Sequence, residues 1–364
     1  MLPPNPAAAV SPSGAPVSIA PPDPLEYPFG DTLPAPGELL EVAPGVHWLR
    51  MPLPFELNHI NLWLLRDGEG WTIVDTGYGG GDETRVLWER IFDKYLEGKP
   101  VNRVLITHFH PDHFGLATWL SERWGVKVWI SLGEFMAAHL VWSGGAAYRT
   151  NGMYRLFRAH GLSESYLDKM DMRRDAYQMG VPELPSYYRR VMDNEQIVID
   201  GNAWQVIMGY GHAPEHAAYY CEKLKVMISG DMVLPRITTN ISVWPTEPDG
   251  NPLQLFLDSA RRYRTLPAAT LVLPSHGKAF RGLPIRAEAL IAHHDARFEE
   301  LRSALTTPKS AAEVVPVLFR RKMDERQMFF AMGEAIAHLN CLMYAGEIRR
   351  ELGPDRVYRF ALNR

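Results

Sequence analysis

The sequence predicts an α/β protein built from layers of strands and helices. Two observations lead to this fold class. Short runs rich in β-branched and aromatic residues alternate with stretches that carry apolar residues at helical spacing. Several of the apolar runs also end in a polar, glycine-flanked cluster that contains His or Asp. At 364 residues, 46% of them hydrophobic, the chain can form one large domain or two smaller ones with a sizeable core.

The N-terminal segment, residues 1–37, differs from the rest of the chain. It holds eleven of the 29 prolines and no Lys or Arg. A signal peptide needs a basic start and an unbroken apolar run, and a transit peptide needs arginines. We therefore expect neither, and predict a disordered or surface-wrapping arm.

The regular elements begin at about residue 38. The segments VHWLRMPL (46–53) and HINLWLLRD (59–67) predict two strands, and GWTIVDTGYGGG (70–81) predicts a strand that ends in a glycine-rich loop. A helix is predicted at 82–98, then a strand that runs into THFHPDHFG (107–115), then a helix at LATWLSERWG and a strand at VKVWIS. This β-α-β order indicates a layered α/β architecture.

Seven residues in the clusters at strand ends are candidate metal ligands. Two histidines at positions i and i+2 of an extended segment project to the same side, so His108 and His110 can bind one ion. Pro111 turns the chain, after which Asp112 and His113 can face a second ion nearby. Imidazole and carboxylate groups are ligands that zinc prefers, with iron and manganese as competitors. The later strands QVIMGYGH, KVMISGDMVLP and ATLVLPSHG add His212, Asp231 and His276.

These motifs resemble those of the metallo-β-lactamase superfamily. The matching segments are IVDTG, THFHPDH, GYGHAPEH, SGD and PSHG, in that order, and the resemblance covers about residues 40–280. It implies a four-layer αββα sandwich with the site at one edge of the two sheets. It also implies that His108, His110 and His212 hold the first metal, that Asp112, His113 and His276 hold the second, and that Asp231 bridges both.

The resemblance also narrows the branch of the superfamily. His110 argues against the flavo-diiron branch, and Asp231 argues against a true β-lactamase. The ligand set is similar to that of hydroxyacylglutathione hydrolases, acyl-homoserine lactonases and transfer-RNA 3′-processing nucleases. In this superfamily the aspartate that matches Asp75 supports the ligand loop, although an aspartate before Gly77 can also serve only the turn. Many relatives have Ser or Thr at the position of Ala213 and Gly at that of Glu215, so transfer of a substrate from relatives is not justified.

Two divalent metals about 3.5–4 Å apart would share a hydroxide that attacks a carbonyl carbon or a phosphorus. Asp112 can then move a proton onto the leaving group, and Asp231 holds the two metals together. The predicted reaction class is therefore hydrolysis.

Two regions outside the motifs bear on the substrate. The segment at about 133–195, inside a predicted domain of 38–284, is rich in helix formers, Met and aromatic residues. We predict that it is a helical insertion that roofs the metal site, with Tyr154 and Phe157 in a substrate pocket; the alternative is that these residues only pack the helices. The mostly helical C-terminal region, 285–364, resembles the winged-helix-like tail of one branch of the superfamily. Residues 281–364 hold 14 Lys and Arg against 11 Asp and Glu, so we expect packing or homodimer formation rather than nucleic-acid binding.

The global composition fits a cytoplasmic enzyme. The net charge of −4 gives no polycationic signature, and no apolar run approaches the roughly 20 residues that cross a bilayer. Two cysteines, Cys221 and Cys341, make no disulfide framework and suit a reducing compartment.

Three functions follow in order of preference. The first is a dinuclear metal-dependent hydrolase, most consistent with zinc, of a small carboxylic ester, lactone or acyl thioester. The second is a phosphodiesterase or ribonuclease on the same metal site. The third is a non-catalytic protein that binds DNA or a partner and retains a vestigial site.

Overall fold

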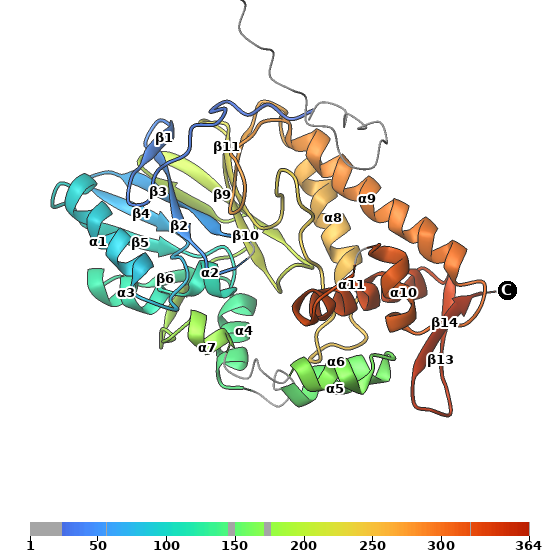
Figure 1. Cartoon of the computed structure of the whole chain (residues 1–364). Coiled ribbons are helices and arrows are strands. Elements are labelled where there is room, and N and C mark those ends of the chain that lie inside the picture. The colour runs from blue at the N-terminus through green and yellow to red at the C-terminus, as the bar shows by residue number, and fades with distance from the viewer. Residues whose placement is uncertain (1–23, 56, 145–149, 171–175, 321, 364) are drawn as a thin grey trace, which may run out of the picture.

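The computed structural model describes residues 24–55, 57–144, 150–170, 176–320 and 322–363 of the chain. Two β-sheets lie face to face, and helices cover the outer face of each sheet (Figure 1). The predicted four-layer αββα sandwich is therefore confirmed. The part of the predicted N-terminal arm before residue 24 lies outside the described residues.

The first sheet has its seven strands in sequence order. The first four strands pair antiparallel, and the last three join in parallel. The strands are β1 (Leu40–Ala43), β2 (Val46–Pro52), β3 (His59–Asp67), β4 (Gly70–Val74), β5 (Val101–Leu105), β6 (Val128–Ile130) and β7 (Tyr188–Arg190).

The second sheet has five strands in the order β12-β11-β10-β9-β8. All neighbours are antiparallel except β11 and β12. The inner faces of the two sheets bury Trp48, Trp63, Trp204 and Tyr219 between them. The strands are β8 (Gln196–Ile199), β9 (Asn202–Gly209), β10 (His216–Cys221), β11 (Val226–Gly230) and β12 (Leu271–Pro274).

The outer layers are helical. Helices α1 (Glu83–Tyr95) and α3 (Ala117–Trp124) cover the first sheet through a core that includes Trp88, Phe92 and Leu120. Helices α8 (Pro252–Arg264) and α9 (Leu283–Ala304) cover the second sheet (Figure 1).

The segment predicted as an insertion is helical; part of it lies beside the first sheet and part beside the C-terminal helices. Its first and last helices, α4 (Leu132–Trp142) and α7 (Ala176–Gly180), lie below the first sheet in Figure 1. The middle pair, α5 (Thr150–Ala159) and α6 (Glu164–Met170), lies beside the C-terminal helices. The insertion therefore connects the first sheet to the C-terminal region.

The C-terminal region consists of helices followed by a β-hairpin, as the predicted winged-helix-like tail requires. After α9 come α10 (Ala311–Leu318) and α11 (Glu325–Tyr344), each begun by a capping box, and then β13 (Ile348–Leu352) and β14 (Tyr358–Leu362). Apolar residues of α5, α8, α9 and α11 form one continuous core on the outer face of the second sheet. The C-terminal region is thus part of the main body of the protein.

The chain from residue 24 to the first strand runs along the surface of this body. Glu26 pairs through its backbone with Arg281, and the Leu25 side chain is buried in the core of the C-terminal helices. No helix in the described ranges is both long enough and apolar enough to cross a bilayer.

Candidate metal centre and its cavity

The seven predicted ligands meet at one edge of the sandwich. His108 and His110 follow β5, and Asp112 and His113 lie in the short helix α2 (Pro111–Phe114). The other three follow strands of the second sheet: His212 comes after β9, Asp231 directly after β11, and His276 after β12. Because both sheets end at this edge, residues up to 168 positions apart in the chain become neighbours.

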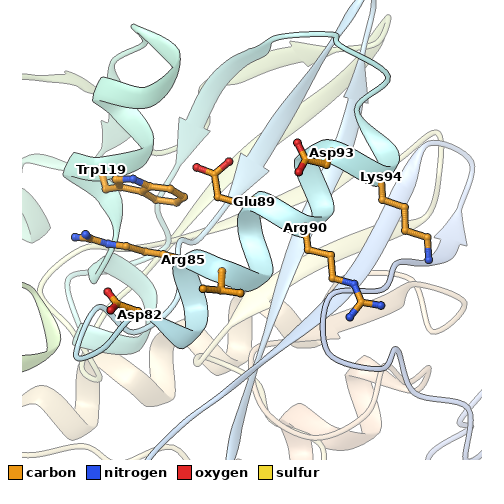
Figure 2. A pocket seen from close by; sticks show the side chains of 8 residues that line it. Asp82, Arg85, Glu89, Arg90, Asp93, Lys94 and Trp119 are labelled. Carbon is orange, nitrogen blue, oxygen red and sulfur yellow. The ribbon is translucent and has the colours of Figure 1, made fainter.

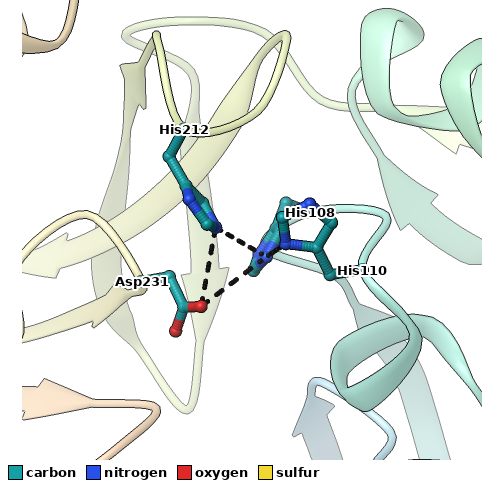
Figure 3. A group of neighbouring side chains, drawn as sticks. All are labelled: His108, His110, His212 and Asp231. Atoms are coloured by element: carbon teal, nitrogen blue, oxygen red, sulfur yellow. Dashed lines mark hydrogen bonds and ion pairs between the residues drawn. The ribbon is translucent and has the colours of Figure 1, made fainter. Parts of the chain in front are cut away.

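The first group contains His108, His110, His212 and Asp231, shown in Figure 3. Nε2 of His108 lies 2.9 Å from Nδ1 of His110 and 3.3 Å from Nε2 of His212. Oδ2 of Asp231 lies 3.5 Å from Nε2 of His212 and 3.9 Å from Nε2 of His108. The four donor atoms therefore face one point.

The second group contains Asp112, His113 and His276. Oδ2 of Asp112 lies 3.3 Å from Nε2 of His276 and 3.6 Å from Nε2 of His113. The other carboxylate oxygen of Asp231, Oδ1, lies 3.6 Å from Nε2 of both histidines. Asp231 thus presents one oxygen to each group.

Hydrogen bonds to the opposite ring nitrogens orient three of these histidines. Nδ1 of His212 donates to the carbonyl of Asn240 at 2.8 Å, and Nδ1 of His276 donates to the carbonyl of His59 at 2.9 Å. Nδ1 of His113 donates to Oδ2 of Asp75 at 2.8 Å. Each bond uses Nδ1, so Nε2 is the nitrogen that remains to bind a metal once any proton on it is displaced.

Asp75 also holds the loop that carries the first ligands. Its Oδ1 accepts a hydrogen bond from the backbone N–H of Thr107 at 2.7 Å, and its Oδ2 accepts one from the Thr107 hydroxyl at 2.8 Å. The side chain is 1% exposed, and the backbone φ of +61° lies in the left-handed region that Asp and Asn tolerate. Asp75 therefore joins the ends of β4 and β5 beneath the site.

Two histidines of the first group, His108 and His110, have lowered pKa values. Burial and the neighbouring histidines hold the pKa of His108 well below its usual value. Burial, assisted by His212, lowers the pKa of His110 to about 3. Neutral imidazoles can donate their lone pairs to a cation.

The second group lies in a negative field. Burial disfavours a charge on His113, but Asp112 and Asp75 outweigh burial and raise its pKa well above the usual value. Burial likewise opposes ionisation of Asp231, but His276 and His113 hold its pKa well below the usual value. Ionised carboxylates beside imidazoles favour a bound cation over the protons that it would displace.

Two buried atoms test whether a metal fits. Nε2 of His113 and Oδ1 of Asp231 are buried, and within the described ranges neither takes part in a hydrogen bond. Buried polar atoms are nearly always partnered, and here both atoms belong to a set of nitrogen and oxygen donors suited to divalent metals. The residues therefore fit the metal that the fold implies.

Two buried residues that the sequence analysis did not identify support the ligand loops. The Glu134 carboxylate, from the start of α4, accepts hydrogen bonds from the backbone N–H of Phe109 at 2.9 Å and of Glu215 at 2.7 Å. Burial raises the Glu134 pKa to about 7, although these two donors act to lower it. The His216 ring stacks on His108 with centroids 4.8 Å apart. Glu134 lies in a helical pattern and His216 beside a ligand, so only the spatial contacts reveal them.

A cavity of about 1050 Å³ opens onto the metal centre. His110, Asp112, His212, Asp231 and His276 form part of its lining. Most of the remaining wall is apolar or aromatic, as is typical of pockets for small molecules. The insertion contributes Val141, Met153, Tyr154, Tyr177 and Met179, and the C-terminal region contributes Phe319, Met323, Phe329, Phe330 and Ala331.

The two predicted pocket residues have different environments. Tyr154 lines the cavity. Phe157 is fully buried, stacks edge-on against Phe329 at 5.6 Å between ring centroids, and is not among the described residues that line the cavity. The insertion therefore both faces the cavity and packs the C-terminal core.

A shallow depression lies elsewhere, along the outer surface of α1 (Figure 2). Four of its charged side chains have surface partners: Glu89 binds Arg123, Arg90 and Lys94 bind Glu38, and the Arg85 guanidinium lies 5.8 Å from the centre of the Trp119 ring. The depression is a solvated helix face, and among the described residues no group of potential metal ligands includes its lining.

Comparisons with known proteins agree with this geometry. Residues 56–276 match the family model of the metallo-beta-lactamase superfamily, and residues 298–363 match that of the metallo-beta-lactamase-like C-terminal domain. The chain is similar to a probable metallo-hydrolase, YqjP, of Bacillus subtilis, at 26% identity over 81% of this chain and 91% of the relative.

Two solved structures are similar over most of the chain. A beta-lactamase domain protein from Burkholderia ambifaria is 53% identical, covers 93% of this chain and 98% of its own, and has a TM-score of 0.86. A metallo-beta-lactamase family protein from Thermus thermophilus is 32% identical, covers 89% of this chain and 100% of its own, and has a TM-score of 0.74. The chain therefore belongs to the metallo-beta-lactamase superfamily and is a hydrolase whose fold implies binding of divalent metal.

Proposed function

We propose that this protein binds two divalent cations, preferably Zn²⁺, and hydrolyses small carboxylic esters, lactones or acyl thioesters. The observation that carries the proposal is the position of Asp231, whose two oxygens face separate groups of ligands at distances of 3.5–3.9 Å. His108, His110 and His212 would hold one ion, Asp112, His113 and His276 the other, and Asp231 both. Such a pair of ions lowers the pKa of bound water and polarises a carbonyl group.

Asp112 and the cavity walls supply the remaining functions. The Asp112 carboxylate lines the cavity, where it can receive a proton and return it to the leaving group. The aromatic and aliphatic walls bind the apolar part of a substrate and exclude water. Ester hydrolysis needs only this combination of an activated water, a proton donor and a shaped apolar pocket.

The charge of the cavity favours an ester over a nucleic acid. Its ionisable lining residues include the carboxylates of Asp112, Asp231, Asp324 and Glu334, and the described lining contains neither Lys nor Arg. A nuclease channel needs cations along the phosphate backbone. We therefore treat phosphodiester hydrolysis as the alternative function, which the substrate panel described below also tests.

The test is metal analysis of the purified protein together with a substrate panel. We expect close to two metals per chain and hydrolysis of esters, lactones or thioesters. His110→Ala and Asp231→Asn should each lose metal and activity, whereas His47→Ala, on β2 and outside the metal groups, should retain both. Preferential hydrolysis of a bis-aryl phosphate would identify the protein as a phosphodiesterase. Full activity of both site variants would contradict the dinuclear site.

We also propose that the protein acts in the cytoplasm, either as a monomer or as a homodimer. Cys221 and Cys341 are both buried and unpaired thiols, which suits a reducing compartment. Light scattering would decide the oligomeric state.

A further inference from the structure

The far wall of the metal cavity comes from the C-terminal region. Phe319, Met323, Phe329 and Phe330 line it together with Glu334, which lies in the middle of α11. The substrate space is therefore shared between the domain that carries the ligands and the domain that follows it. The apolar side chains need no special explanation, but a carboxyl group in this wall does.

Several other polar side chains that line the cavity are used by the fold. The Asp324 carboxylate caps α11 by accepting a hydrogen bond from the backbone N–H of Gln327 at 2.7 Å, and the Gln327 side chain completes the capping box. The Thr239 hydroxyl donates to the backbone carbonyl of Asp231, and the Asn240 side chain accepts from the Ser242 hydroxyl at 2.8 Å.

Glu334 has no such role. No described residue donates a hydrogen bond to its carboxyl group or forms an ion pair with it. Its backbone carbonyl accepts a hydrogen bond from Nδ1 of His338 at 2.8 Å. Burial raises the Glu334 pKa to about 7, against a smaller opposing effect of Arg297. The Glu334 residue is partly exposed and lines the cavity, so a hydrogen-bond donor in the cavity would satisfy a carboxyl group that otherwise lies among apolar side chains.

The backbone of α11 holds Glu334 rigidly relative to the metal centre. The carbonyl of Gly333 accepts a hydrogen bond from the N–H of Val243 at 3.2 Å, and a Cβ at position 333 would lie 2.6 Å from Oγ of Ser242. This close approach needs glycine. The same loop carries Asn240, whose carbonyl orients His212. Glu334 is thus fixed against the loop that holds a predicted ligand.

We propose that Glu334 determines substrate specificity by binding a hydrogen-bond donor, a hydroxyl or protonated amine, on the apolar part of the substrate. The proposal rests on the hydrolase function assigned above to the same cavity. It narrows the substrate to an ester, lactone or thioester whose apolar group ends in a donor. Hydrogen bonds to a charged group are stronger than neutral ones, so an amine should be discriminated most sharply.

The experiment compares p-nitrophenyl hexanoate with its ω-hydroxy and ω-amino derivatives on wild type, Glu334→Gln and Glu325→Gln. Glu325 lies on the same helix, is exposed, pairs with Lys169 and does not line the cavity. Glu334→Gln should lower kcat/KM for the ω-amino ester by about tenfold, equivalent to about 1.4 kcal/mol. It should change the parent ester less than about twofold. Glu325→Gln should resemble wild type with all three esters.

A binding measurement keeps this test separate from hydrolysis. Calorimetry with ketones, in which a methylene group replaces the ester oxygen, should show that wild type prefers the ω-amino or ω-hydroxy ketone to the parent and that Glu334→Gln loses this preference. If no ester is hydrolysed but wild type still binds the ω-amino or ω-hydroxy ketone more tightly than the parent, the proposed function is wrong. The proposed role of Glu334 in binding is then retained. Equal binding of the three ketones, or an equal loss for all three esters in Glu334→Gln, would overturn the role of Glu334.

Discussion

The backbone N–H of Asp231 donates a hydrogen bond to Nε2 of His216, and the two atoms lie 3.1 Å apart. The contact depends on Gly230, since a Cβ there would lie 2.3 Å from the same nitrogen. Because the His216 ring also stacks on His108, it supports Asp231 and a histidine of the first group together.

His216→Leu should weaken metal binding by about 10–100-fold, the usual cost of losing a residue that orients metal ligands. Chelator competition would measure the affinity. His47→Leu is the matched control, because His47 is a partly buried histidine whose Nδ1 lies 3.3 Å from the Leu64 carbonyl, away from the metal groups. Wild-type affinity in His216→Leu would show that the stacking and the hydrogen bond have no influence on the ligands.

Asp75→Asn should reduce metal affinity by a similar factor of about 10–100, mainly at the second group, because Asn has one acceptor oxygen and cannot satisfy both Thr107 and His113 as the two Asp75 oxygens do. Asn tolerates the left-handed backbone, so the substitution tests the charge without adding strain. Asp200→Asn is the control: Asp200 has φ of +49° and lies at an exposed turn. Metal titration followed by elemental analysis measures both variants, and equal stoichiometry and affinity would count against a role for Asp75.

Tyr154→Ala should change the kinetics and Phe157→Ala should change the stability, although both residues lie on one helix. Tyr154 lines the cavity, so its truncation should raise KM or change substrate preference while metal content persists. Phe157 is buried against Phe329, so its truncation should lower the free energy of unfolding by about 3–5 kcal/mol and leave the kinetics unchanged. Urea denaturation and steady-state kinetics on both variants test this difference. Identical behaviour of the two variants would contradict the placement of Tyr154 in the cavity and Phe157 in the core.

Glu334→Gln should change the pH dependence of stability. A glutamate in the unfolded chain titrates near about 4.3, and the folded pKa is about 7, so the folded state keeps the proton in this interval. The free energy of unfolding of wild type therefore falls as the pH rises through that window, whereas Gln does not titrate. The variant should thus gain stability relative to wild type between about pH 5 and about pH 8.

Urea unfolding at several pH values, at fixed metal content, would measure this difference. Glu325→Gln serves again as the control, because hydrogen bonds from its own backbone and from Lys169 lower the Glu325 pKa. Its stability difference from wild type should be constant above about pH 5. A constant difference for Glu334→Gln as well would mean that its carboxyl group is well solvated.

Leu25→Ala should destabilise the protein by about 2 kcal/mol, because this side chain is 8% exposed and belongs to the core of the C-terminal helices. Leu33→Ala, at a position that is 38% exposed, should change the free energy of unfolding by less than about 0.5 kcal/mol. Thermal denaturation of both variants tests whether the segment before the first strand is anchored.

The layered fold and the positions of the candidate ligands could be predicted from the sequence because both depend on local patterns. Val101–Leu105 and Val226–Gly230 are short, mostly apolar strands; His108 and His110 follow the first within five residues, and Asp231 directly follows the second. Each signal lies within about ten neighbouring residues. The order of the motifs supplied the rest of the ligand set.

The walls of the cavity could not be predicted in the same way. Tyr154 and Phe157 are three positions apart on α5, and their different environments depend on how the C-terminal helices cover that helix. Glu134 and Glu334 lie in ordinary helical patterns, and only contacts with Phe109 or with the cavity distinguish them from solvated glutamates. Homodimer formation and the absence of nucleic-acid binding stay predictions.

The shared core has a consequence for how the chain folds during synthesis. Helix α11 packs against apolar residues of α5 and α8, yet residues 325–344 are synthesised long after both. Because a nascent chain emerges from its N-terminal end, that apolar face stays exposed to solvent until α11 has been made. Chaperones should therefore bind ribosome-associated intermediates that end before residue 325, and slower translation of the segment between α9 and α11 should prolong that binding.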